Sequence, residues 1–281
     1  MRRIASPQET IMRLNFTKMN GAGNDFVMID NRDLSIQLSS EQIAKVCDRH
    51  RGVGADGLLA AEPAENGADF KFRYYNADGG EAEMCGNGAR CFGRYTARLL
   101  ETPQEVITFE TIAGTLAARM VGDDVEVAMP DPFDLELDST ITVEGLSPAL
   151  HHLNTGVPHA VAFVDDLAGL DILKLGAAIR YHDHFQPPGI NANFVSEVSP
   201  GHIAIRTYER GVENETLACG TGMVACAIIY HLLKGAASPV KVDVRGGETL
   251  SIGFQGDAES GFRNATLTGH ADFVFDGQIE L

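Results

Sequence analysis

The sequence predicts an α/β protein made of two matching halves, and two repeated landmarks support this prediction. Cys85 is followed by Gly-Asn-Gly and a helix-like run, and Cys219 is followed by Gly-Thr-Gly and a second helix-like run. Glycine turns at Gly21 and Gly156 precede them. Gly156 follows Gly21 by 135 positions, and Cys219 follows Cys85 by 134. We interpret this register as an ancient duplication, with a pseudo-twofold axis across which the two cysteines face each other.

Alternating and β-rich runs predict the strands of the first half, and capped runs predict its helices. A glycine-rich turn over 20–24 joins the first two strands, and Ser39 with Gln42 forms a capping box that opens a helix. Helices are expected over 39–47 and 85–100. Strands are expected over 16–19, 26–30, 58–61, 70–76, 106–110, 115–120 and 125–129.

The second half repeats this order after Pro130-Asp131-Pro132, which breaks the pattern and is the expected linker. A turn at 156–159 precedes the first strand. Helices are expected over 171–179 and 219–233, and strands over 160–164, 193–198, 202–208, 240–244, 250–254, 265–268 and 272–275. The expected domains are 13–131 and 132–270, with a strand over 271–281 that returns to the first domain and a disordered extension over 1–12.

The composition limits the classes of partner. The 281 residues carry a formal net charge of −17, and 44% of them are hydrophobic. The chain can bury a core, but it lacks the excess of Lys and Arg that binding to nucleic acid requires. No apolar run approaches the roughly 20 residues of a transmembrane helix, and the N-terminus lacks the apolar segment of a secretory signal. We therefore expect a cytoplasmic protein that binds a small molecule and neither nucleic acid nor membrane.

The five cysteines lie at positions 47, 85, 91, 219 and 226, without a C-x-x-C motif. An odd number without that motif favours reduced thiols in a cytoplasmic protein. Cys47 and His50 form a C-x-x-H pair, but no second pair of ligands accompanies it, so we expect no metal site. The simplest alternative for any one cysteine is a buried and inert thiol.

Cys85 and Cys219 each precede the likely first turn of a helix, where free N–H groups and the helix dipole favour a thiolate. Two thiols on opposite sides of one carbon can invert its configuration, because one removes a proton and the other returns a proton from the opposite face. The N–H groups of the two Gly-x-Gly turns suit an α-carboxylate, on which negative charge develops. Nothing in the sequence resembles a phosphate cup with a Schiff-base lysine, so we expect no cofactor.

Several stretches of the chain resemble the diaminopimelate epimerase family. They are NGAGNDF (20–26), RHRGVGADGLL (49–59), NADGGEAEMCGNGARC (76–91), TGVPHAV (155–161), GINANF (189–194) and ERGVENETLACGTG (209–222). The resemblance implies two pseudo-symmetric domains, each a mixed barrel-like β-sheet wrapped around a central helix, and a homodimer. It also implies interconversion of LL- and meso-diaminopimelate without a cofactor, in the biosynthesis of lysine and of peptidoglycan precursors.

The resemblance also assigns roles to individual residues. The catalytic acid–base pair is Cys85 and Cys219. The residues that tune the thiol pKa values are His159 and Glu209. The reacting carboxylate is held by Gly86, Asn87, Gly220 and Thr221, and the rest of the substrate is bound by Asn24, Asn76, Asn191, Glu209 and Arg210. The offset between the halves places Asn76 opposite Arg210, and Asn24 opposite His159.

Three positions depart from the family pattern. Asn20 stands where a histidine is common, Val157 where some members have a substrate-binding asparagine, and Gly57 where some have a glutamine. The latter two changes affect individual polar contacts rather than the expected reaction.

Three other functions compete with this interpretation. The first is racemisation of another amino acid, of the histidine or proline type, on the same scaffold. The second is binding of a small molecule without turnover, and the third is redox chemistry through a Cys85–Cys219 disulfide. Arg210, with Asn76 and Asn191, is expected to bind the distal part of the substrate. This set suits a second amino-acid head group, which proline lacks. We interpret a disulfide between two close thiols as an inactivating side reaction.

Overall fold

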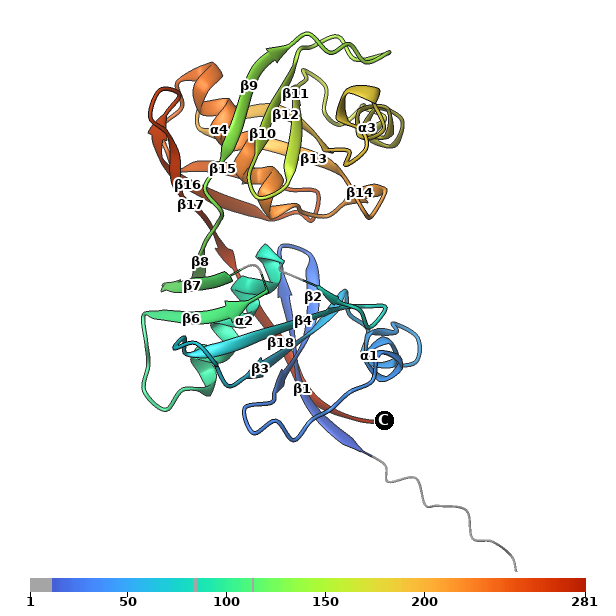
Figure 1. The fold of residues 1–281 in the computed structure, drawn as a ribbon, viewed down its shortest axis with the longest axis vertical. Helices are drawn as coiled ribbons and strands as arrows, with labels where there is room; N and C mark the ends of the chain where they lie inside the picture. The colour runs from blue at the N-terminus through green and yellow to red at the C-terminus, as the bar shows by residue number, and fades with distance from the viewer. Residues whose placement is uncertain (1–11, 83–84, 113) are drawn as a thin grey trace, which may run out of the picture.

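The computed structural model describes residues 12–82, 85–112 and 114–281, which form two lobes (Figure 1). The first half of the chain and the C-terminal strand form one lobe, and the second half forms the other. The extension expected over 1–12 lies outside the described residues, except for Met12. In the part of the chain that the structure describes, no helix is long and apolar enough to cross a membrane.

The two halves present their elements in the same order. The first half contains β1 (Arg13–Gly21), β2 (Asn24–Asp30), α1 (Ser40–Cys47), β3 (Gly57–Glu62), β4 (Phe70–Asn76), β5 (Glu81–Ala82), α2 (Gly86–Leu99), β6 (Val106–Thr111), β7 (Gly114–Val121) and β8 (Asp124–Ala128). The rest of the chain contains β9 (Phe133–Ser139), β10 (Leu150–Asn154), β11 (Pro158–Phe163), α3 (Ile172–Arg180), the 3₁₀ helix η1 (Asp183–Phe185), β12 (Asn191–Ser199), β13 (His202–Glu209), β14 (Asn214–Thr216), α4 (Gly220–Lys234), β15 (Val240–Asp243), β16 (Thr249–Asp257), β17 (Gly261–His270) and β18 (Asp272–Glu280).

Strand pairing follows one plan in both lobes. In the first lobe β1–β2 and β3–β4 are antiparallel, β2–β3 and β4–β6 are parallel, and β6, β7 and β8 are antiparallel. In the second lobe β10–β11 and β12–β13 are antiparallel, β11–β12 and β13–β15 are parallel, and β15, β16 and β17 are antiparallel. The correspondence extends to β18 beside β1 and β9 beside β10.

One antiparallel pair, β8 with β17, joins the lobes. In Figure 1, β17 extends from the second lobe toward the first, where β18 continues the chain along β1. Through this pair, the strands of the described residues form one connected sheet of 18 strands. The relative position of the two central helices therefore depends on hydrogen-bonded strands rather than on a flexible linker.

Each lobe wraps its sheet around one helix. Helix α2 contacts β1, β2, β3, β6, β7 and β8, and α4 contacts strands of the second lobe from β10 to β17. The segment of α4 from Met223 to Tyr230 is buried without interruption, which is typical of a helix enclosed on all sides. The structure confirms the predicted mixed α/β fold with a sheet around a central helix.

The two remaining α-helices lie outside the sheets. Helix α1 packs against β3, and its capping box is formed as predicted, since the Ser39 hydroxyl accepts from the Gln42 N–H and the Gln42 side chain accepts from the Ser39 N–H. Helix α3 covers β12 and β13, and the Asp171 carboxylate caps it by accepting from the Lys174 N–H.

The sequence prediction missed β5, β9, β10 and β14. Strands β5 and β14 have two and three residues, too few to show a period. Most side chains of β9 are exposed, so this strand lacks the apolar alternation that marks a half-buried strand. In strand β10 the two leucines are three positions apart, so its apolar residues do not alternate.

Candidate active site

The N-termini of α2 and α4 meet, and each begins after a cysteine. Cys85 and Cys219 are the N-cap residues, with φ/ψ of −136°/122° and −127°/107°. A Cβ built on Gly86 would lie 3.9 Å from Gly220 Cα, and a Cβ built on Gly220 would lie 3.8 Å from Gly86 Cα. The two Gly-x-Gly turns are thus so close that a Cβ added to either glycine would touch the other. Both cysteines are free thiols, and Cys85 lies close enough to act on the pKa of Cys219.

Burial dominates the pKa of both thiols. Burial, with a smaller contribution from the Glu209 carboxyl, raises the pKa of Cys219 to about 12. Cys85 is only partly buried, but desolvation still raises its pKa, again with Glu209 acting in the same direction. N–H groups in the first turn of each helix lower both pKa values, as the sequence predicts, but desolvation outweighs them. The prediction of a net shift toward thiolate is therefore wrong for the protein without substrate.

A chain of hydrogen bonds lies behind Cys219. The Thr221 hydroxyl is 3.6 Å from Cys219 Sγ and 2.9 Å from His159 Nε2. His159 Nδ1 is 3.1 Å from Asn193 Nδ2, and the Thr207 hydroxyl donates to Asn193 Oδ1 at 2.9 Å. Burial lowers the pKa of His159 to about 3, so its imidazole is neutral at pH 7.

Amide groups and a buried guanidinium support the turn after Cys85. Asn87 Nδ2 donates to Asn24 Oδ1 at 2.7 Å, and Asn24 Nδ2 donates to Asp56 Oδ2 at 2.9 Å. Arg90, which is 0% exposed, donates from Nη1 to Asn87 Oδ1 at 2.9 Å. The Arg90 bond leaves the amino end of the Asn87 side chain directed at Asn24.

An ion-pair cluster supports the hairpin that carries Asn24. Asp25 accepts two bonds from Arg49, at 2.7 and 2.9 Å, and pairs with Lys18 at 2.7 Å. Arg49 also pairs with Asp56 at 2.8 Å. Burial opposes ionisation of Asp25, but the two cations prevail and lower its pKa to about 2.

Three residues predicted to bind the distal part of the substrate lie at strand ends. Asn76 is exposed at the end of β4, whereas Asn191 is buried at the start of β12. The Asn191 side chain donates to Pro158 O at 3.0 Å and accepts from the Arg210 N–H at 2.9 Å. The Arg210 guanidinium donates to Pro188 O at 3.2 Å. In this structure Asn191 thus holds the backbone that presents Arg210.

Glu209 is the last residue of β13 and is partly buried. Burial raises its pKa, and the nearby Thr216 side chain opposes this shift. Since Glu209 contributes to the raised pKa of both Cys85 and Cys219, its carboxyl acts on both sulfurs.

The sheet register revises the sequence correspondence at His159. In the parallel pair of the first lobe, Phe26 is opposite Gly57. In the equivalent pair of the second lobe, His159 is opposite Asn191. His159 therefore occupies the place of Phe26, not that of Asn24, as the sequence offset suggested.

The same register revises the partner of Asn76. Asn76 is the last residue of β4 and lies opposite Gly57, and Glu209 is the last residue of the equivalent strand β13. Asn76 therefore matches Glu209 rather than Arg210. The sequence offset was wrong by one position because the segments between these strands and the cysteines differ in length by one residue.

Sequence reasoning gave no role to Asn193, Thr207, Arg90 or Asp56, although three of them lie in the quoted family stretches. Alternation along a strand offered one signal, because Asn193 follows Asn191 by two positions and must share its face. For Thr207, alternation with Ile203 and Ile205 indicates the buried face of its strand but not its contact with Asn193, which belongs to a different strand.

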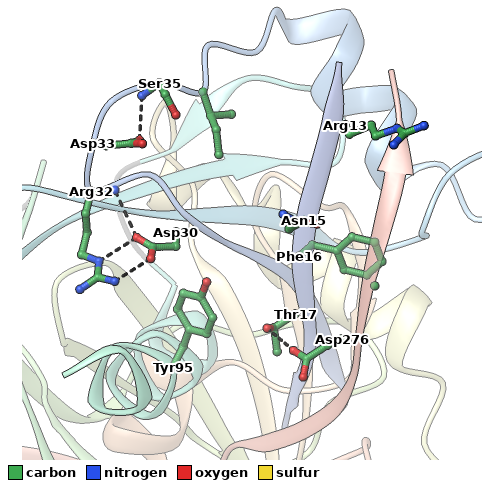
Figure 2. Close-up of a pocket in the computed structure, with 12 residues that line it drawn as sticks. Arg13, Asn15, Phe16, Thr17, Asp30, Arg32, Asp33, Ser35, Tyr95 and Asp276 are labelled. Atoms are coloured by element: carbon green, nitrogen blue, oxygen red, sulfur yellow. Dashed lines mark hydrogen bonds and ion pairs between the residues drawn. The ribbon is translucent and has the colours of Figure 1, made fainter. Parts of the chain in front are cut away.

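Figure 2 shows a hollow of the first lobe that no cysteine lines. It lies beside β1, β18 and the turn after β2, and no predicted site residue lines it. Its cations already have partners, since Arg32 makes two bonds to Asp30, at 2.7 and 2.8 Å, and Arg13 pairs with Glu280 at 3.2 Å.

Sequence comparison establishes the family. A sequence profile described as diaminopimelate epimerase matches residues 16–133 and 152–274. The chain belongs to the diaminopimelate epimerase family. The matched ranges contain both cysteine turns and all the residues named above as candidates, so the resemblance predicted from the sequence motifs is confirmed at the level of the family.

Relatives named diaminopimelate epimerase resemble the chain along nearly its whole length. The protein from Aquifex aeolicus (strain VF5) is 45% identical over 279 residues, covering 95% of this chain and 98% of the relative. The protein from Chlorobaculum tepidum is 41% identical over 269 residues, covering 94% and 100%. Family membership identifies the chain as an isomerase of the epimerase type.

Solved structures with lower sequence identity share the fold. A phenazine biosynthesis protein of the PhzF family from Bacillus anthracis matches with a TM-score of 0.73 at 15% identity, covering 95% of this chain and 99% of that protein. A hydroxyproline epimerase from Agrobacterium vitis matches with a TM-score of 0.69 at 20% identity, covering 96% and 91%. At these identities the likeness shows a common architecture and carries no argument about substrate.

Proposed function

We propose that this protein interconverts LL- and meso-diaminopimelate without a cofactor, with Cys85 and Cys219 as the two proton carriers. The observation that carries the proposal is the meeting of two cysteine-capped helix N-termini in a chain of this family. One sulfur, as the thiolate, takes the proton from the α-carbon. The other sulfur, as the thiol, gives its proton to the opposite face, so the stereocentre inverts and the two sulfurs exchange protonation states.

The helix ends stabilise the charge that develops during this reaction. N–H groups of Gly86, Asn87, Gly220 and Thr221 hold the α-carboxylate, into which the electron pair of the broken C–H bond delocalises. Donors fixed in advance by the two helices stabilise the transition state more than the ground state. The substrate's α-ammonium adds positive charge near the sulfurs, which opposes the effect of burial on the thiol pKa.

In this proposal, each remaining candidate residue binds the substrate or tunes the pKa of the thiols. Substrate-binding residues are Asn24, Asn76, Asn191, Glu209 and Arg210, and the residues that tune the thiols are His159 and Glu209. We also propose domains over 13–131 with 271–281 and over 132–270, a homodimer, a cytoplasmic location, and a place in lysine and peptidoglycan precursor biosynthesis.

Isotope incorporation tests the reaction. Incubation of the reduced protein with LL-diaminopimelate in D₂O, without added cofactor, is expected to yield meso product with deuterium at the inverted α-carbon, measured by mass spectrometry and chiral chromatography. Proline and histidine serve as competing substrates. Deuterium exchange on either of them, with none on diaminopimelate, contradicts the proposal.

A further inference from the structure

The Asn193 side-chain amide has a fixed orientation. Its Nδ2 is 3.0 Å from Ala160 O, and its Oδ1 accepts from the Thr207 hydroxyl at 2.9 Å. Because a carbonyl oxygen only accepts, Nδ2 is the amino end of the amide. The same Nδ2 is 3.1 Å from His159 Nδ1. His159 Nδ1 is therefore an acceptor and carries no proton.

This assignment sets the direction of every later bond. A neutral imidazole has one N–H, which must lie on Nε2 of His159. Nε2 is 2.9 Å from Thr221 Oγ1 and donates to it. The O–H of Thr221 is then available to Cys219 Sγ at 3.6 Å. The Thr155 hydroxyl holds the same turn by donating to the Thr221 carbonyl at 2.9 Å.

The equivalent positions of the first lobe are apolar. A Cβ built on Gly88 would lie 3.3 Å from Leu59 Cδ1 and 3.5 Å from Phe26 Cε1. A Cβ built on Gly222 would instead lie 2.5 Å from Asn193 Oδ1. Since the first lobe folds on the same plan with Leu59 and Phe26 in these places, the scaffold does not require the polar set of the second lobe.

We propose that Asn193 is a positioning residue that fixes the tautomer of His159, so that the Thr221 hydroxyl donates to the Cys219 sulfur and stabilises its thiolate. Only the importance of this effect for turnover rests on the proposed function. The direction of the bonds and the reactivity of the sulfur are properties of the protein without substrate, and they are measured without epimerase activity.

The expected effect follows from the loss of one bond to a charged sulfur. Such a bond corresponds to roughly 1 to 2 pKa units. The thiolate of a thiol with a higher pKa is also more nucleophilic, which offsets about half of the change in rate. Alkylation of Cys219 by iodoacetamide near pH 8 is therefore expected to slow about three- to tenfold when the donor is lost.

The variant Asn193→Leu installs the side chain that stands at the matching position of the first lobe. Peptide mapping by mass spectrometry after timed alkylation gives the rates of Cys219 and Cys85 in the same sample. The ratio of the Cys219 rate to the Cys85 rate is expected to fall about three- to tenfold. Asn31→Leu is the matched control, because Asn31 is a buried asparagine of the first lobe that donates to Ile36 O at 3.2 Å. It is expected to leave the ratio unchanged.

A double-mutant cycle tests whether Asn193 acts through His159. His159→Gln keeps an amide in place of the imidazole, and Asn193→Leu added to this variant is expected to change the Cys219 rate much less than it does alone. Equal changes in both backgrounds contradict the proposal, as does a parallel fall in the Cys85 and Cys219 rates.

The wild-type protein provides a test that does not depend on the folding of any variant. Nitrogen-15 NMR of labelled histidine is expected to show the His159 proton on Nε2 at neutral pH. A proton on Nδ1 overturns the proposal. Deuterium incorporation from D₂O is scored separately, so a protein that fails to epimerise diaminopimelate but shows this tautomer and this rate ratio refutes the function and retains the inference.

Discussion

The two lobes share one backbone plan but differ in the side chains at three equivalent strand positions near the cysteine turns. In the first lobe these are Phe26, Leu59 and Tyr74, and in the second lobe they are His159, Asn193 and Thr207. Within each set, two residues lie opposite each other in the sheet, Leu59 with Tyr74 and Asn193 with Thr207. One set forms an apolar contact surface and the other a chain of hydrogen bonds.

This difference shows which parts of the duplicated scaffold are interchangeable. The backbone conformations of Cys85 and Cys219 are nearly equal, as expected if both faces of one carbon need the same proton carrier. The surroundings of the sulfurs differ, as expected if only one end of a longer substrate reacts and the other end is held. Proton transfer at both faces of one carbon thus requires the same backbone around both cysteines. Binding of the substrate and tuning of the thiol pKa values do not require the same side chains in both lobes.

The largest effect on activity is expected from replacing either of the two cysteines, which the lobes have in common. Cys85→Ala and Cys219→Ala are each expected to lower the rate of epimerisation by roughly 10³-fold or more, because each face needs its own acid–base group. Circular dichroism and the unfolding midpoint are expected to stay near those of the wild type. Near-normal turnover by either variant in both directions refutes the two-cysteine mechanism.

The next largest effect is expected at Arg210, which is proposed to bind the distal end of the substrate. Arg210→Lys keeps the charge but loses the planar fork that binds a carboxylate through two parallel bonds. Loss of one bond to a charged group predicts a fall in kcat/KM on diaminopimelate of roughly 10- to 150-fold. Kinetics on alanine, which has no distal head group, are the control, and this slow reaction is expected to change little. Equal penalties on both substrates contradict the assignment of Arg210 to the distal end.

The pH dependence of thiol reactivity tests the environment that the lobes share. A thiol whose pKa is raised is protonated at neutral pH, and its thiolate fraction grows tenfold per pH unit until the pH reaches the pKa. Because burial raises the pKa of Cys219 to about 12, its alkylation rate without substrate is expected to rise about 100-fold from pH 7 to pH 9 and to keep rising above it. Rates measured by peptide mapping that level off below pH 9 contradict this.

Much of the fold could be predicted from local patterns, because these patterns act within a few residues. The capping box at Ser39 and Gln42 and the turn at Gly156 formed where the sequence placed them. The missed strand β9 shows the limit, since most of its side chains are exposed and hydrogen bonds to β10, rather than a hydrophobic pattern, define it.

The parts of the site that repeat along the sequence could be predicted, whereas contacts between distant strands could not. The two cysteine turns were found because the same motif occurs twice, and the structure brings them together. Strand alternation could place Asn193 on the same face as Asn191, but its contacts with His159 and Thr207 were not predictable, because they join three different strands. The net pKa shift of the thiols was also missed, since desolvation depends on how the two lobes enclose the sulfurs.

The last prediction replaces a residue of the first lobe by the one at the equivalent position of the second lobe. This substitution is expected to have the smallest effect on turnover and a clear effect on the free energy of unfolding. Leu59→Asn places an amide beside Phe26 and Tyr74 at a position that is 0% exposed. The amide loses its hydrogen bonds to water, and the apolar contacts of the leucine are lost as well. The free energy of unfolding is expected to fall by about 2–4 kcal/mol, measured by urea denaturation. Leu59→Met, which keeps volume and polarity, is the control and is expected to cost less than about 1.5 kcal/mol.

Turnover per folded molecule is expected to stay close to that of the wild type, because Phe26 cannot pass a hydrogen bond from the new amide to the Asn87 turn. A Leu59→Asn protein as stable as Leu59→Met would mean that a polar group is accommodated in this lobe too, and the contrast between an apolar and a hydrogen-bonding support would then not hold.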